Sequence, residues 1–253
     1  MSKITREKFK TYNNVFDNFT MRNLFKLSSE GFYDEVVGTV ALGKEANIFT
    51  AVRQDGSLVI IKIYRLENCN FNKMFDYIRQ DPRYETLSSK KREIVFAWTQ
   101  REFRNLLKAR ECIRVPTPYK VKDNIIVMEL IGENDVPAPQ LKDALPDNPE
   151  EFFDKIIENV KKLYKVGLVH GDLSHFNILN SNEEPVFIDF SQSTVTSSRD
   201  AEDLLRRDME TLCKFFKSKC RVSYDVDEIV EKILPPKKDR SVFRDHITNE
   251  DLK

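Results

Sequence analysis

The chain has 253 residues with a 40% hydrophobic share, enough to bury roughly 70 to 75% of the surface that the unfolded chain would expose. Its 41 basic residues balance its 41 acidic ones, so only local patches, and no overall field, can attract nucleic acid or an acidic membrane. Because no apolar run approaches the roughly 20 residues of a membrane span and the four cysteines form no CxxC pair, we expect a cytoplasmic protein with reduced thiols and no membrane or DNA partner.

The first half of the chain is predicted to be rich in strands. Residues 5–30 and 90–110 have the apolar spacing of helices. Five β-rich runs are typical of strands, at residues 36–40, 47–53, 58–64, 119–121 and 125–130. Asp-Gly at residues 55–56 and Asp-Asn at residues 123–124 predict hairpin turns. We therefore expect a three-stranded meander, then a helix, then a second hairpin.

The second half is predicted to be mostly helical. Prolines punctuate the stretch after Gly132, which favours irregular structure there. One apolar face then runs through residues 152–164 and stops at Gly167, and a further helix is expected at residues 200–217. The polar residues 235–253 are expected to be loosely attached. A β-rich half before a helical half predicts an α+β fold.

Two acidic motifs in this second half predict a phosphotransfer site. Asp172 follows an apolar run, Asn177 comes five residues later, and Asp189 follows the next short apolar run. Transfer of a phosphoryl group from ATP requires one carboxylate to orient the acceptor hydroxyl, and oxygen ligands to hold Mg²⁺ against the phosphates. An isolated HxD motif would more often be a polar turn, but the second motif at the correct spacing favours ATP chemistry.

Lys62 is a charged residue in the middle of an apolar strand, where burial without a partner would cost several kcal/mol. A lysine in this position of a kinase-type sheet binds nucleotide phosphates and pairs with a helix glutamate. Glu102 is the first candidate for that glutamate and Glu93 is the second. The alternative is a lysine that extends to water from a strand edge.

The turn between the first two strands is a candidate phosphate-binding loop. It contains a single glycine, and its backbone N–H groups could lie over phosphates. By glycine pattern alone, an ordinary hairpin turn is the better interpretation. The candidate residues are Leu42, Gly43, Lys44, Glu45 and Ala46.

Together these segments resemble the RIO atypical protein kinases. The motifs that carry the resemblance are Gly43 to Phe49, Lys62 to Arg65, Asp76 to Ile78 with Asp81 to Arg83, Trp98 to Asn105, Val115 to Pro118, His170 to Ser174 and Ile188 to Ser191. The resemblance runs from about Phe32 to Phe216. It is to the first branch of the family, which lacks a winged-helix domain, and the length suits an archaeal member.

This resemblance implies a two-lobed, protein-kinase-like α+β fold. A small antiparallel β-rich N-lobe with a regulatory helix would precede a mostly α-helical C-lobe, truncated so that it has neither an activation segment nor a peptide platform. The implied divisions are an N-terminal helical extension at residues 1–31, an N-lobe at 32–131 with an insertion at 68–91, and a C-lobe at 132–253.

The resemblance also implies the role of each site residue. Asp172 would be the catalytic base, and Asn177 and Asp189 would hold Mg²⁺, with Mn²⁺ as a substitute. Lys62 would position the phosphates of ATP with Glu102 as its partner, and Asp189 could carry a transient aspartyl phosphate. Other implied ATP-binding residues are the candidate loop, Leu42 to Ala46, with Ser174, and Glu129 and Ile131, whose backbones would bind adenine.

Asp208 is implied to hold the catalytic loop from beneath, although without the resemblance an exposed charge on an amphipathic helix would be the better interpretation. The sequence also departs from ordinary protein kinases in two motifs. His170-Gly171-Asp172 lacks the arginine of HRD, and Asp189-Phe190-Ser191 lacks the glycine of DFG.

The implied function is that of a serine protein kinase and ATPase that transfers the γ-phosphate of ATP to itself or to water during maturation of the small ribosomal subunit. Its partners would be ATP and a small-subunit precursor containing RNA and protein. The insertion at residues 68–91 interleaves basic and aromatic residues that could contact RNA, or it could be a solvated loop packed by its own aromatics. The other functions considered are a small-molecule phosphotransferase like the aminoglycoside and choline kinases, and a binding module without activity.

Overall fold

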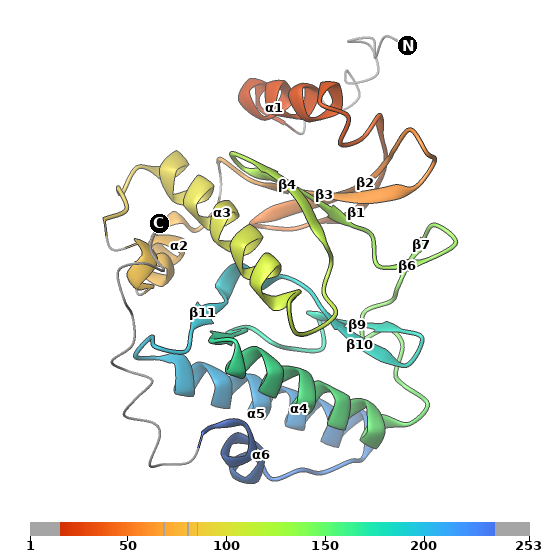
Figure 1. The fold of residues 1–253 in the computed structure, drawn as a ribbon, viewed down its shortest axis with the longest axis vertical. Helices are drawn as coiled ribbons and strands as arrows, with labels where there is room; N and C mark the ends of the chain where they lie inside the picture. Colours follow the sequence, from red (N-terminus) through yellow and green to blue (C-terminus); the bar gives the residue numbers. More distant parts are fainter. Residues whose placement is uncertain (1–15, 68, 80, 85, 236–253) are drawn as a thin grey trace. The chain divides into compact units, whose positions relative to one another are not determined.

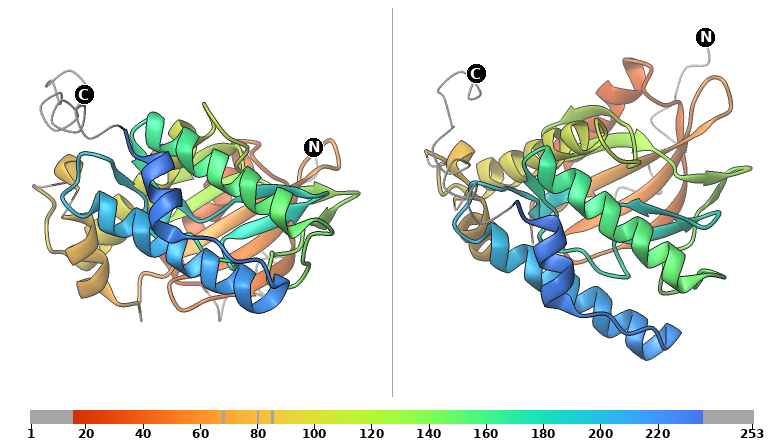
Figure 2. Two further views of the ribbon diagram at one scale, coloured as in Figure 1. Left: turned by 90° about the horizontal axis from the view of Figure 1, so that it is seen from below. Right: turned by 60° about the horizontal axis from the view of Figure 1, so that its bottom comes forward.

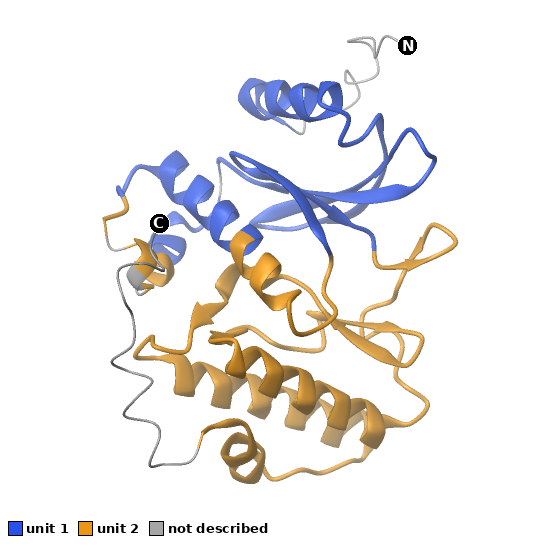
Figure 3. Ribbon diagram, in the orientation of Figure 1, with its two compact units in different colours: residues 1–75, 88–103, 117–130 blue, residues 76–87, 104–116, 131–253 orange. Residues whose placement is uncertain are grey.

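The computed structural model describes residues 16–67, 69–79, 81–84 and 86–235. Two predictions fall partly outside these residues: residues 5–15 of the predicted N-terminal helix and residues 236–253 of the predicted loose tail. The chain forms two compact units, shown in Figure 3. Unit 1 contains residues 1–75, 88–103 and 117–130, and unit 2 contains residues 76–87, 104–116 and 131–253. Within the described residues, no helix has the length and apolar character needed to cross a membrane.

Unit 1 is built on a five-stranded antiparallel sheet with the strand order β1-β2-β3-β5-β4 (Figure 1). Its strands are β1 (Glu35–Leu42), β2 (Ala46–Val52), β3 (Leu58–Tyr64), β4 (Pro118–Lys122) and β5 (Ile125–Glu129). The predicted meander corresponds to β1, β2 and β3, and the predicted hairpin to β4 and β5. Since β5 pairs with β3, the hairpin extends the meander into a single sheet.

Helix α1 (Asn18–Ser29) covers one face of this sheet (Figure 1). Asp17 caps it, because its carboxylate accepts hydrogen bonds from the Phe19 and Thr20 N–H groups at 2.8 and 3.0 Å. The helix packs its apolar side into a core of buried residues: Leu24, Leu27, Tyr33, Phe49, Ala51, Val59, Ile61, Ile63, Ile125 and Val127. These contacts fix which side chains of β3 point toward α1.

Successive side chains of β3 point to opposite faces of the sheet, as in any β-strand. Val59, Ile61 and Ile63 point into the core beneath α1, so Lys62 and Tyr64 point to the other face. Helix α3 (Lys91–Ala109) supplies the partner of these two polar side chains. The chain of α3 belongs to unit 1 as far as residue 103 and to unit 2 from residue 104.

Unit 2 is mostly helical, as predicted. Helices α4 (Pro149–Lys165) and α5 (Ala201–Cys220) lie side by side, and α6 (Val226–Ile233) packs against both (Figures 1 and 2). Asn148 caps α4 and Pro149 occupies its first turn, while Gly167 follows its end with a positive φ of 81°. The short paired strands are β6 (Gly132–Glu133) with β7 (Val136–Pro137), β8 (Leu168–Val169) with β11 (Thr194–Val195), and β9 (Ile178–Ser181) with β10 (Glu184–Phe187).

Residues 68–91 are more regular than the sequence suggested. They contain helix α2 (Phe71–Ile78) and one turn of 3₁₀ helix, η2 (Pro82–Tyr84). Neither element was predicted. The predicted division into residues 1–31, 32–131 and 132–253 stays a prediction, since the two compact units are assembled from separate stretches of chain.

Candidate active site

A buried ion pair in unit 1 holds Lys62. The Lys62 Nζ lies 2.7 Å from the Glu102 Oε1, and the two residues are 6% and 1% exposed. Glu102 is therefore the lysine's partner, whereas Glu93 lies 3.2 Å from Lys90 near the surface. A buried lysine needs such a partner, because an uncompensated charge in the interior is strongly destabilising.

Tyr64 is a third member of this cluster that sequence analysis missed. Its hydroxyl donates to the Glu102 Oε2 at 2.5 Å, and the Lys62 Nζ lies 5.1 Å from the centre of its ring. Both carboxylate oxygens of Glu102 are thus bonded within unit 1. The sequence feature that could have identified Tyr64 is its spacing of two residues from Lys62, because this spacing places both side chains on one face of β3.

The turn from β1 to β2 is tight. The Gly43 N–H donates to the Ala46 carbonyl at 3.0 Å, and a Cβ at Gly43 would lie 2.7 Å from that carbonyl oxygen, so a side chain would not fit. Leu42, Gly43 and Lys44 are exposed and Glu45 is half-buried. The geometry is that of a hairpin turn, and phosphate binding by its N–H groups stays a prediction.

The two residues predicted to bind adenine belong to different units: Glu129 to unit 1 and Ile131 to unit 2. Glu129 ends β5, where its N–H donates to the Thr117 carbonyl at 2.9 Å and its Oε2 accepts from the Thr117 N–H at 3.0 Å. Ile131 is the first residue of the next stretch of unit 2, and its carbonyl accepts from the Ala138 N–H at 2.8 Å. These bonds fix the backbone of each residue, and adenine binding stays a prediction.

The loop between β8 and β9 in unit 2 exposes Asp172. The Asn177 Nδ2 donates to the backbone oxygen of Asp172 at 2.8 Å and lies 3.4 Å from its Oδ2. Because the amide nitrogen is used in this way, Oδ1 is the atom that Asn177 would offer to a cation. Ser174 shapes the turn between them, accepting from the Asn177 N–H with its carbonyl at 2.9 Å and from the Phe176 N–H with its Oγ at 3.3 Å.

The β9–β10 hairpin brings Asp189 close to Asn177. Phe187 pairs with Ile178, and the Ile188 N–H donates to the Asn177 carbonyl at 3.0 Å, so Asp189 follows directly after the last hydrogen bond of the hairpin. Asp189 has a left-handed backbone, with a φ of 62°, and its Oδ1 accepts from the Ser191 N–H at 3.4 Å. Strained backbone of this kind costs on the order of 1–3 kcal/mol and is concentrated at functional sites.

The donors at these two positions fit Mg²⁺. Both side chains offer oxygen, which Mg²⁺ prefers, and Mg²⁺ is commonly held by one or two protein groups together with phosphate oxygens and water. Within the described residues, no group of three or more His, Cys, Asp or Glu side chains could hold a metal ion by itself.

Asp208 anchors the loop that carries Asp172. This buried residue of α5 accepts from the Gly171 N–H at 2.8 Å and from the Leu173 N–H at 3.0 Å, one bond on each side of Asp172. Burial raises the pKa of Asp208 to about 7, although the two N–H groups oppose that shift. Gly171 has a positive φ of 77°, and a Cβ there would lie 2.9 Å from the Gln192 carbonyl oxygen.

His170 links the loop that carries Asp172 to the segment that leads to Asp189. Its Nε2 lies 3.1 Å from the Ile188 carbonyl and its Nδ1 accepts from the Asp172 N–H at 3.4 Å, so one tautomer, with the proton on Nε2, satisfies both contacts. The residue is 3% exposed, and the centre of its ring lies 4.8 Å from the centre of the Phe190 ring. This histidine is thus a structural link and not an exposed ligand.

Comparisons with known proteins identify the family of this chain. The sequence model of the RIO domain family matches residues 47–229. The chain belongs to the RIO family. The RIO-type serine/threonine-protein kinase Rio1 of Methanocaldococcus jannaschii is 44% identical over 214 residues, which cover 84% of this chain and 73% of the relative. Rio1 of Haloferax volcanii is 38% identical, covering 83% and 73%. Human RIO1 is 31% identical over 89% of this chain and 41% of the human protein.

Solved RIO structures share the fold. The Rio2 kinase–ADP/Mg²⁺–phosphoaspartate complex of Chaetomium thermophilum superposes with a TM-score of 0.65 at 22% identity, covering 91% of this chain and 72% of that chain. A second Rio2 kinase structure from the same organism has a TM-score of 0.62 at 20% identity. These likenesses confirm the predicted kinase-like α+β fold.

The truncation predicted for a RIO chain is visible after Asp189. Residues 190–200 form only the 3₁₀ turn η3 (Phe190–Gln192), the short strand β11 and a turn before α5 begins. This length leaves no room for an activation segment with a peptide platform.

The structure changes the interpretation of residues 68–91. Lys73 and Arg79 are exposed, but Tyr84 is buried and Phe71, Phe75 and Tyr77 are half-buried, which favours packing by the segment's own aromatics over base stacking. The guanidinium of Arg83 is hydrogen-bonded to Asp81 and Asn105 inside unit 2, so this basic residue of the segment is engaged within the fold. A contact that was not predicted joins this segment to the loop that carries Asp172. Arg207 donates hydrogen bonds to the Gly171 carbonyl in that loop and to the Tyr77 hydroxyl in the segment.

The raised pKa of Asp208 predicts a pH dependence of stability. Between its ordinary value of 3.8 and about 7, the folded chain keeps a proton that the unfolded chain has lost. This group's contribution to the free energy of unfolding is therefore greatest at low pH, and it falls by about 1.4 kcal/mol per pH unit as pH rises through that window.

Urea unfolding of the wild type and Asp208→Asn from pH 4.5 to 8 measures this effect. Because its side chain stays neutral, Asp208→Asn should lack this fall, so its stability relative to that of the wild type should increase as pH rises from 4.5 toward 7. Asp154→Asn on the exposed side of α4 is the control and should keep the wild-type slope. Equal slopes for the wild type and Asp208→Asn would contradict the assignment.

Proposed function

We propose that this chain is an ATP-dependent, serine-directed protein kinase of the RIO type that also hydrolyses ATP. The observation that carries the proposal is the pairing of an exposed Asp172, whose flanking N–H groups are bonded to Asp208, with Asn177 and Asp189 at the end of one hairpin. The buried Lys62–Glu102 pair in unit 1 supports it. So do the family match and the relatives named as serine/threonine-protein kinases.

Each residue then has a defined task. Lys62, kept in place by Glu102, binds phosphate oxygens of ATP, and the N–H groups of residues 42–46 bind others. Asn177 and Asp189 hold Mg²⁺, which supplies positive charge against the phosphates when bound. Asp172 accepts the proton of the attacking hydroxyl as the oxygen–γ-phosphorus bond forms and the bond to the β-phosphate oxygen breaks, releasing ADP.

Asp189 is the residue proposed to accept a transient phosphoryl group. Support comes from the related Rio2 kinase, whose structure is a complex with ADP, Mg²⁺ and phosphoaspartate. The short segment 190–200 also favours transfer to the protein itself or to water, since it provides no peptide platform. The small-molecule phosphotransferase alternative is not favoured, because the relatives are protein kinases.

The first prediction concerns the catalytic aspartates. Asp172→Ala should bind nucleotide normally while turnover drops by roughly 10² to 10⁴, the usual contribution of a positioned general base. Asp189→Asn should instead raise the Mg²⁺ concentration needed for half-maximal turnover. Both are measured by release of labelled phosphate in a Mg²⁺ titration, with Asp154→Ala as an exposed control. Undiminished turnover of Asp172→Ala would remove it from the mechanism.

The second prediction separates hydrolysis from protein phosphorylation. Without a peptide platform, phosphate release without added substrate should exceed transfer to a generic protein such as myelin basic protein. Labelled ATP is incubated with the pure protein, and the label is followed into water, the chain itself, the generic protein and a small alcohol. Rapid stoichiometric labelling of the generic protein would contradict the prediction, and labelling of the alcohol would favour the small-molecule alternative.

The third prediction concerns the partner, which we propose to be a precursor of the small ribosomal subunit in the cytoplasm. Asp172→Ala should accumulate on these particles, because ATP stays bound while the hydrolysis that allows release is lost. Binding should weaken as salt rises, and replacing the exposed Lys73 and Arg79 with Gln should flatten that dependence.

Sucrose-gradient sedimentation of cell extract tests the partner. The inactive variant should sediment with small-subunit precursors more than the wild type does. Finding it only with free protein at the top of the gradient would contradict the ribosomal role while leaving the kinase chemistry intact.

A further inference from the structure

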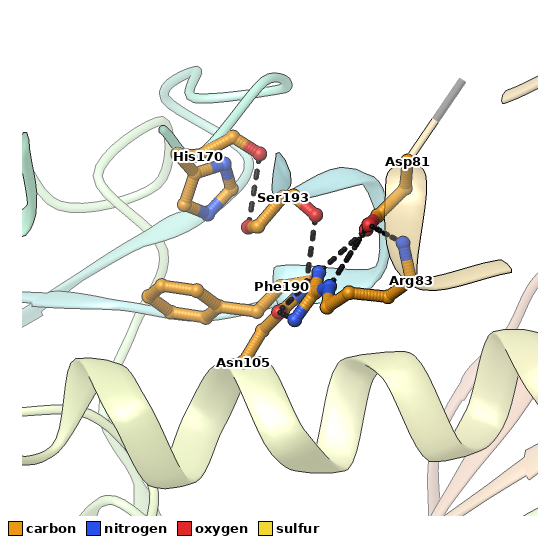
Figure 4. Close-up of polar contacts among 6 residues, drawn as sticks. All are labelled: Asp81, Arg83, Asn105, His170, Phe190 and Ser193. Atoms are coloured by element: carbon orange, nitrogen blue, oxygen red, sulfur yellow. Dashed lines mark hydrogen bonds and ion pairs between the residues drawn. The ribbon is translucent and has the colours of Figure 1, made fainter. Parts of the chain in front are cut away.

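A chain of buried polar contacts in unit 2 begins in the segment before α3. The Asp81 carboxylate, which is 0% exposed, accepts two parallel hydrogen bonds from Arg83, at 2.9 Å to Nε and 2.6 Å to Nη2 (Figure 4). Both Nη atoms of Arg83 also lie 3.2 Å from the Asn105 Oδ1. The planar fork of a guanidinium can bridge a carboxylate and an amide in this way, which a lysine ammonium cannot do with the same geometry.

Asn105 continues the chain to the turn that follows Asp189. Its Nδ2 donates to the carbonyls of Phe190 at 3.1 Å and Ser193 at 2.9 Å. The side chain is fully buried, and the contacts fix its orientation, because a flipped amide would place its NH₂ against the Arg83 donors and its oxygen against two carbonyls.

The far end of this chain lies beside both catalytic segments, as Figure 4 shows for the residues it labels. Phe190 follows Asp189 directly in sequence. Ser193 donates its hydroxyl to the His170 carbonyl at 3.0 Å, two residues before Asp172. The amide of Asn105 thus constrains the η3 turn at its first residue and just beyond its last.

The constraint matters because Asp189 has a left-handed backbone, with a φ of 62°. A non-glycine residue keeps such a conformation only where its surroundings fix it strongly. The bond from the Ser191 N–H to the Asp189 Oδ1 is 3.4 Å long, and the two bonds from Asn105 to the carbonyls of Phe190 and Ser193 restrain the same turn.

We propose that Asp81, Arg83 and Asn105 form a positioning relay that orients Asp189 for Mg²⁺. Through this relay, the segment of residues 76–87 sets the affinity of the site for the Mg²⁺–nucleotide complex. The relay rests on the proposed function, since it assigns Asp189 as a metal ligand. None of its three residues touches the reacting atoms; each acts through the turn that follows Asp189.

The test is a binding titration that needs no turnover. A non-hydrolysable ATP analogue is titrated into the wild type, Arg83→Gln and Arg83→Lys at several Mg²⁺ concentrations and in EDTA. Arg83→Gln should raise the Mg²⁺ concentration for half-maximal binding by about 10-fold or more, as loss of a residue behind a metal ligand typically does. Arg83→Lys should give a smaller shift in the same direction, and binding in EDTA should not change.

The matched control is Arg206→Gln, which removes an exposed ion pair with Asp227 from unit 2 by the same substitution. It should leave the Mg²⁺ dependence unchanged. The melting temperature of every variant is measured in parallel, because a purely structural role of Arg83 would lower it without moving the Mg²⁺ dependence.

A double-mutant cycle tests whether the residues act together. If Arg83 and Asn105 belong to one relay, Arg83→Gln combined with Asn105→Ala should shift the Mg²⁺ dependence no further than the larger single change. Additive shifts would overturn the relay. So would a normal Mg²⁺ dependence in both Arg83 variants while Asp189→Asn shifts it, an outcome that would leave the proposed function standing. Wild-type nucleotide binding that is insensitive to Mg²⁺ would instead overturn the proposed function.

Discussion

A buried carboxylate is the constraint on which the loop that carries Asp172 depends. Asp208 accepts hydrogen bonds from the N–H groups on both sides of Asp172, so the exposed aspartate is presented by a backbone that has little freedom. Burial opposes ionisation of Asp208 and raises its pKa to about 7. Because Asp208 is buried, it contributes less to the stability of the folded chain near neutral pH than at low pH. The same buried carboxylate holds the loop, and sites with a function often include such locally destabilising features.

The same principle of buried polar groups with defined partners recurs in both units. Lys62 and Tyr64 bind the two carboxylate oxygens of Glu102 in unit 1. In unit 2, Arg83 and the turn after Asp189 bind the oxygen and the nitrogen of the Asn105 side-chain amide. Buried pairs of this kind contribute little net stability compared with apolar packing. Their value is geometric, because each allows one arrangement of the side chains involved.

The segment of residues 76–87 therefore has a role inside the protein as well as at its surface. Asp81 and Arg83 face inward to Asn105, and the Tyr77 hydroxyl meets Arg207 beside Gly171. A basic and aromatic composition had favoured RNA contact and internal packing about equally. Burial of Tyr84 and Asp81, and partial burial of the other aromatics, favour packing for much of the segment, and cations such as Lys73 stay exposed to a partner.

The sequence by itself determined the elements and motifs whose cause is local. The apolar, β-rich run around Lys62 predicted that it lies within a strand, and the spacing of Asp172, Asn177 and Asp189 along the chain predicted one site. Only the tertiary structure decided between Glu102 and Glu93, and only it revealed the bonds of Asn105. These choices join residues far apart in sequence, and they depend on which face of a helix is buried, whereas periodicity and turn chemistry encode only neighbours along the chain.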